Sequence, residues 1–98
     1  MQPPANIKVR EFEWDEENLE HVRPHGLTLE LAEEIKDGAP LFFLNRPGRG
    51  GTHMMIGPDD SGRFWTIILV EAGAEGRWRP ITGWPSDNPE IRWYNEAT

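Results

Sequence analysis

The chain contains no cysteine, and this absence excludes several kinds of site. Without thiols there is no disulfide framework, no thiolate zinc site and no cysteine nucleophile. Long apolar runs are also missing: the longest covers residues 64–70, far short of the roughly 20 residues that a membrane-spanning helix needs. The N-terminus shows no basic segment followed by an apolar one. We therefore expect a soluble, cytoplasmic protein that has no membrane partner and is stabilised by packing.

Positive charge is scarce as well. The 98 residues include 10 Lys and Arg against 17 Asp and Glu, a net charge of −7 at pH 7. Nucleic-acid-binding proteins usually carry a basic excess, so this balance argues against a general nucleic-acid binder. The acids, however, concentrate in residues 11–37, and every basic residue after Lys36 is an arginine. Arginine suits bidentate contact with phosphate, although it is equally common in surface ion pairs.

The length and the turn pattern predict one α+β domain over residues 1–98, because a chain of this size buries enough surface for a single core. Residues 1–6 are expected to form a poorly ordered tail. Alternation over residues 7–14 predicts a first strand with one aromatic face. Asp15 and Thr28 are N-cap residues of two short helices, and Gly38 ends the second.

After Pro40 the pattern changes to strands, expected over residues 41–45, 52–56, 64–71 and 77–84. Residues 64–71 are apolar on both faces, which predicts a central strand. Pro80 cannot donate a ladder hydrogen bond, so its strand is expected to lie at an edge or to contain a bulge. Asn88 before Pro89 predicts a last helix that begins at Pro89. Short N-terminal helices are thus expected to pack on a small twisted antiparallel sheet, with a helix at the C-terminus.

Arginine and tryptophan concentrate in residues 76–94. Strict alternation would put Arg77, Arg79 and Ile81 on one face of the strand and Trp78, Thr82 and Trp84 on the other. Guanidinium groups bind phosphate and indole rings stack on bases, so if the protein binds a nucleic acid, this segment is where the contact is expected. The plainer interpretations remain open: ion pairs for Arg79 and Arg92, packing for Trp78, Trp93 and Tyr94, and a partner surface for Trp84.

Several short motifs in a fixed order resemble the BrnT-like toxins of bacterial toxin–antitoxin pairs. They are Phe12-Glu13-Trp14-Asp15-Glu16-Glu17-Asn18, then His25-Gly26-Leu27-Thr28, then Arg77-Trp78-Arg79-Pro80-Ile81-Thr82, and finally Glu90-Ile91-Arg92-Trp93-Tyr94. The resemblance covers about residues 10–96. It implies a RelE-like fold, endoribonuclease activity and a ribbon-helix-helix antitoxin that neutralises the toxin.

Metal-independent cleavage of RNA requires cations for the phosphate and groups that transfer protons at the 2′ and leaving oxygens. We assign the phosphate-stabilising role to Arg63, Arg79 and Arg92, and proton transfer to Tyr94, with His53 and Glu90 as further candidates. Arg49, Arg77 and Trp84 are expected to contact RNA, although a flexible hairpin is the simpler interpretation of the segment that contains Arg49. No cofactor is expected. His21 and His25 have a helical ligand spacing that Pro24 interrupts, so no metal site is expected either.

Two departures from the family pattern support a second hypothesis. Family members usually carry an arginine shortly after the last strand, where this chain has Trp84, and a basic residue before the His-Gly pair, where it has Pro24. The alternative is a catalytically degenerate BrnT-like domain that acts as a protein-binding module.

Overall fold

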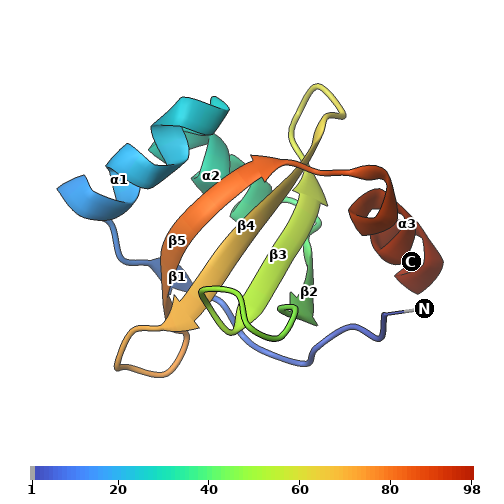
Figure 1. Ribbon diagram of the computed structural model, residues 1–98, viewed down its shortest axis with the longest axis horizontal. Helices are drawn as coiled ribbons and strands as arrows, with labels where there is room; N and C mark the ends of the chain where they lie inside the picture. The colour runs from blue at the N-terminus through green and yellow to red at the C-terminus, as the bar shows by residue number, and fades with distance from the viewer. Residues whose placement is uncertain (1) are drawn as a thin grey trace.

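The protein is an α+β structure in which a five-stranded sheet separates its helices (Figure 1). The computed structural model describes residues 2–98. Helices α1 and α2 lie on one side of the sheet and α3 on the other. Among residues 2–98, no helix is long and apolar enough to cross a membrane. The elements are β1 (Glu11–Phe12), α1 (Glu16–Val22), the 3₁₀ turn η1 (Arg23–His25), α2 (Leu29–Asp37), β2 (Leu41–Leu44), β3 (His53–Pro58), β4 (Phe64–Glu71), β5 (Arg77–Pro85) and α3 (Asn88–Ala97).

The strand order is β1-β5-β4-β3-β2, which confirms β4 as a central strand. Strands β2 to β5 pair antiparallel, but β1 pairs with β5 in parallel, so the sheet is mixed and the expectation of an antiparallel sheet was wrong. The first strand is also far shorter than predicted. Because β5 begins at Arg77, opposite Glu11, residues 7–10 have no strand to pair with, and Asp15 then turns the chain into α1.

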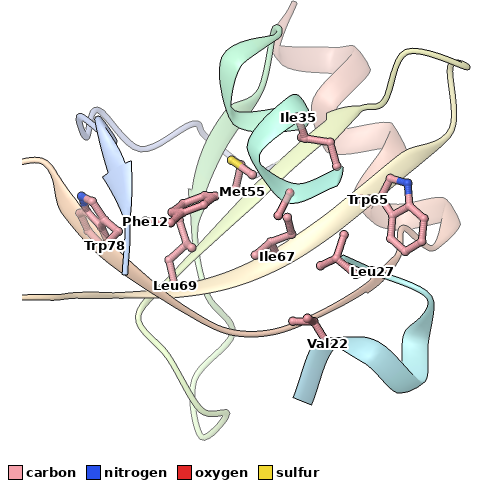
Figure 2. Close-up of a cluster of buried hydrophobic side chains, with 10 residues drawn as sticks. Phe12, Val22, Leu27, Ile35, Met55, Trp65, Ile67, Leu69 and Trp78 are labelled. Carbon is pink, nitrogen blue, oxygen red and sulfur yellow. The ribbon is translucent and has the colours of Figure 1, made fainter. Parts of the chain in front are cut away.

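Each face of the sheet carries its own apolar cluster. The first lies under α1 and α2 and includes Phe12, Leu27, Trp65 and Trp78 (Figure 2). The second lies under α3, where Trp93 and Tyr94 pack against buried residues of β2, β3 and β4. The packing interpretation of Trp78, Trp93 and Tyr94 is confirmed.

The caps of the two N-terminal helices follow the sequence prediction. The Asp15 carboxylate accepts a hydrogen bond from the Asn18 amide at 3.1 Å, and the Thr28 hydroxyl accepts one from the Leu31 amide at 3.1 Å. Helix α3 instead begins one residue before the predicted Pro89. Asp87 is its N-cap, because Asp87 and Glu90 exchange reciprocal side-chain to backbone hydrogen bonds of 2.9 Å.

The N-terminal segment differs from its prediction. Residue 1 lies outside the described residues, but residues 2–6 run along β2 rather than forming a loose tail. The Ala5 amide donates to the Phe42 carbonyl at 2.6 Å, and Pro4 forms an isolated bridge with Phe43. The segment thereby covers backbone groups at the outer edge of β2, which otherwise would lack partners in the sheet.

A β-bulge interrupts the pairing of β4 with β5. Ile68 pairs with Thr82 while Leu69 pairs with Pro80, so Ile81 is an extra residue in β5. The bulge next to Pro80 was one of the two predicted alternatives. Its consequence was not predicted: it shifts the alternation, so that Thr82 and Trp84 lie on the same face as Ile81 and not on the face of Trp78.

Candidate functional site

The α3 side of the sheet contains an open groove that α3 leaves uncovered. It consists of two adjoining hollows of about 210 and 200 Å³, both lined by Ile81. We call them the α1 end and the loop end of the sheet groove. The α1 end is lined by Glu17, Asn18, His21, Val70, Arg79 and Ile81, and the loop end by Asn45, Arg49, Gly50, Ile68, Ile81, Thr82 and Trp84.

The α1 end is dominated by an ion-pair cluster around Arg79. Its guanidinium contacts Asp15 with two hydrogen bonds of 2.6 and 3.0 Å and approaches Glu13 and Glu17 at 3.5 Å each. The hydrogen bonds from Arg79, helped by the Asn18 amide, lower the pKa of Asp15 to about 2. The side chain of Arg79 is only 21% exposed. One cation thus faces three carboxylates, which leaves this end with a negative balance.

Arg77 belongs to the same network. It pairs with Glu11 at 3.3 Å and with Glu13 at 3.4 Å, and it lies beyond the groove at the start of β5. Both arginines therefore tie β5 to the acidic segment around β1 and α1. The ion-pair interpretation of Arg79 describes the contacts that the structure shows.

The Asp15 contacts predict an acid-sensitive contribution to stability. Because its pKa in the folded state lies below the ordinary 3.8, the contribution is present above that pH and is lost as the pH falls toward about 2. Asp15→Asn, which keeps a good N-cap residue, should therefore weaken the acid dependence of the free energy of unfolding. Urea unfolding followed across this pH range measures the effect. Glu16→Gln, outside the Arg79 cluster, is the control, and an equal change in both variants would contradict the assignment.

The loop end is bounded by β5 and by residues 45–51. This segment is expected to be a flexible hairpin, but its contacts anchor it. The Asn45 side chain donates to the carbonyls of Gly50 and Gly51 at 2.7 and 3.2 Å, and Arg46 lies 5.0 Å from the centre of the Trp93 ring. Arg49 is exposed at the mouth of the hollow.

The buried Glu90 side chain connects the strands and the loop that surround the loop end. Its side chain is 0% exposed and accepts hydrogen bonds from the Thr66 hydroxyl at 3.0 Å and the Trp84 indole at 3.1 Å. Arg46 approaches the same carboxylate at 3.5 Å. Because Glu90 is enclosed and does not line the groove, its position is that of a structural anchor rather than of a proton-transfer group.

The remaining nominated residues lie away from the groove. Arg63 is exposed in the β3–β4 hairpin and lies 4.8 Å from the centre of the Trp65 ring. It precedes β4, whereas Arg79 pairs near the far end of β4, which separates them by roughly 20 Å at the usual rise per residue. Arg92 is exposed on α3, and the Tyr94 hydroxyl donates to the Ala39 carbonyl at 2.6 Å.

His53 also lies elsewhere, since its ring packs against Trp78 with the ring centres 5.0 Å apart. Burial lowers the pKa of His53. Of the residues that the sequence suggested for RNA binding or catalysis, Arg49, Arg79 and Trp84 line the groove. The others, Arg63, Arg77, Arg92, Tyr94 and His53, do not.

His21 is the groove residue that the sequence did not single out for RNA chemistry. It lines the α1 end together with Arg79. The sequence did indicate that Glu17 and His21 share one face of α1, because they are four residues apart. What was missing was the position of that face beside β5, which only the tertiary structure supplies.

The fold and the groove define an α+β protein with a mixed five-stranded sheet and an open site on the α3 side. Comparison of the chain with protein-family models, with curated proteins and with solved structures finds no match.

Proposed function

We propose that this chain is the toxin component of a toxin–antitoxin pair and that it cleaves RNA at the sheet groove without a metal ion. The class comes from the ordered motifs that resemble BrnT-like toxins. The observation that carries the site is the bulge at Ile81, since it puts Thr82 and Trp84 on the open face that also holds Arg79. The antitoxin would be a ribbon-helix-helix protein, as the resemblance implies.

The groove contains the side-chain types that the reaction requires. The ribose 2′ oxygen attacks the adjacent phosphorus, the bond from phosphorus to the 5′ oxygen breaks, and the products are a 2′,3′-cyclic phosphate and a 5′ hydroxyl. The His21 imidazole accepts the 2′ proton, and water returns a proton to the 5′ oxygen. Arg79 stabilises the charge on the reacting phosphate, Arg49 binds the RNA backbone at the loop end, and Trp84 supplies an aromatic surface for a base. Arg63, Arg92 and Tyr94 are left out of this site because they do not line the groove.

Cleavage of a mixed RNA in the presence of EDTA tests the proposal. Wild-type protein should cut the RNA, and His21→Ala and Arg79→Ala should each lower the rate by about a hundredfold or more, the usual contribution of a positioned proton-transfer group or charge stabiliser. Arg23→Ala is the matched control, because Arg23 is an exposed arginine of η1 outside the groove. RNA that stays intact at high protein concentration would rule out the ribonuclease.

Carboxylates compete with phosphate for Arg79, and this competition yields a separate expectation. Asp15→Asn removes the closest negative charge, so the affinity for single-stranded RNA should rise by roughly threefold to fivefold, as expected for an exposed ion pair. Fluorescence anisotropy with a labelled oligonucleotide measures this change. Glu16→Gln removes the same charge outside the cluster, and an equal gain in that variant would assign the effect to net charge alone.

The second candidate is a protein-binding module on the same scaffold. It is favoured by the three carboxylates around Arg79 and by the wide separation of Arg63 from that residue. Intact RNA in the EDTA assay, unimpaired growth of a bacterium that expresses the chain alone, and a stable complex with a ribbon-helix-helix protein encoded by the adjacent gene would together support it.

A further inference from the structure

The loop end of the groove has the size and lining of a pocket for one flat ring. Its volume of about 200 Å³ is below the range of drug-sized ligand sites, which begins near 300 Å³. Ile68 and Ile81 supply apolar side chains to its wall, and Trp84 supplies an aromatic one. A flat heteroaromatic ring with a polar edge matches this combination of a small volume and an aromatic wall.

Both walls of the pocket are held in place before any ligand binds. The Trp84 indole donates to Glu90 at 3.1 and 3.3 Å, and Arg46 ties the opposite loop to the same carboxylate at 3.5 Å. The Thr52 amide at the end of the loop donates to the Leu69 carbonyl at 2.9 Å. A pocket with fixed walls loses little conformational entropy on binding, which favours a small ligand.

Polar groups at the mouth remain for a ligand. Within residues 2–98, Thr82 makes no side-chain hydrogen bond and Arg49 makes neither a side-chain hydrogen bond nor an ion pair, although both line the pocket. This contrasts with the α1 end, where Arg79 is engaged by carboxylates. A hydroxyl at the rim suits the edge of a base, and a nearby guanidinium suits a phosphate.

We propose that the loop end of the sheet groove binds a single unpaired nucleotide, with its base against Trp84, its edge at the Thr82 hydroxyl and its phosphate on Arg49. The inference rests on the proposed function for the class of ligand, RNA, but does not require that the RNA is cleaved. The occupied pocket would place the neighbouring phosphate along the groove toward Arg79.

NMR titration with the four ribonucleoside 5′-monophosphates tests the pocket directly. At least one nucleotide should shift the Trp84 indole N–H resonance and the methyl resonances of Ile68 and Ile81 saturably. Ribose 5-phosphate and inorganic phosphate should leave the Trp84 resonance in place. Arg49→Ala should weaken nucleotide binding by about tenfold, in line with the loss of one charge-assisted phosphate contact, and Thr82→Val should change the preference among bases.

Arg23→Ala is the control for the loss of positive charge and should bind as the wild type does. Both Arg23 and Arg49 are exposed, so neither variant disturbs the core, and the dispersion of the same spectra checks folding. If nucleotides shift the resonances of other residues instead, or if inorganic phosphate alone causes equal shifts, the proposed nucleotide site is wrong even if the protein cleaves RNA. Shifts at the pocket without any RNA cleavage would leave the pocket standing and reject the ribonuclease.

Discussion

Replacing Glu90 by alanine should destabilise the protein by about 3 kcal/mol, the usual cost of removing one partner from a buried charged network. The carboxylate is 0% exposed and accepts hydrogen bonds from the Thr66 hydroxyl, the Trp84 indole and the Asp87 amide. Arg46 lies 3.5 Å from it. Its loss removes the acceptor of the Trp84 indole and half of the capping box of α3. The Thr66 hydroxyl then keeps only Ser86 as a partner, and Arg46 keeps only Asp87, at 3.9 Å. Urea unfolding at neutral pH measures the change.

Two variants separate the role of this carboxylate from that of its helix. Glu90→Gln keeps a side-chain oxygen in the same position and should therefore lose less stability than Glu90→Ala. Glu96→Ala changes an exposed acid on the same helix and should have little effect. A loss below about 1 kcal/mol for Glu90→Ala, within the range of an ordinary surface substitution, would contradict the anchoring role.

Gly51→Ala is expected to have a comparable effect, on the order of 3 kcal/mol, because it combines backbone strain with overpacking. Gly51 has a φ of 84°, in the left-handed region, and an added Cβ would overlap Cγ2 of Ile68 and lie 3.3 Å from the Leu69 carbonyl oxygen. Since Ile68 lines the loop end and would collide with the added methyl group, the loop has to move away from the sheet. The same unfolding measurement applies, and the nucleotide shifts of Ile68 should be lost.

Gly48→Ala is the matched control in the same loop. Gly48 has a φ of 78°, but an added Cβ would meet no atom within 4 Å. It carries the backbone strain without the overlap, so its cost should be about 1 kcal/mol, and the difference between the two variants isolates the contact with Ile68. Equal losses in both variants would show that strain alone accounts for the effect.

Both variants address the way in which the sheet groove is built. Glu90 holds the Trp84 wall and the Arg46 side of the loop, and Gly51 lets the loop backbone lie against the sheet. A loss of stability in either variant should therefore be accompanied by a loss of nucleotide binding at the loop end. The α1 end, which depends on Asp15 and Arg79, should keep its acid dependence.

Local features of the fold were predictable from the sequence because they depend on neighbouring residues. Asp15 and Thr28 cap the helices that they were expected to cap, and the apolar run of β4 forms the central strand. The Asp87 cap was missed by one position because Asn88 before Pro89 has the same signal. The packing of Trp78 and Trp93 also followed from residue type, since large aromatic side chains bury much area.

The candidate site was predictable only in part. The sequence suggested Arg49, Arg79 and Trp84, and these residues line the groove. Arg63 lies in the β3–β4 hairpin, and Arg92 and Tyr94 lie on α3, so these three residues do not line it. His21 was passed over because no local pattern indicates which strand its helix lies beside.

The sequence by itself determined where the helices and the central strand lie, because capping and periodicity act over a few residues. Only the tertiary structure decided which side chains share the groove. Strand register is set by pairing between distant segments, so one extra residue at Ile81 changed the face of Thr82 and Trp84. The pairing of Arg79 with Asp15 and Glu13 is likewise a contact between segments far apart in the chain.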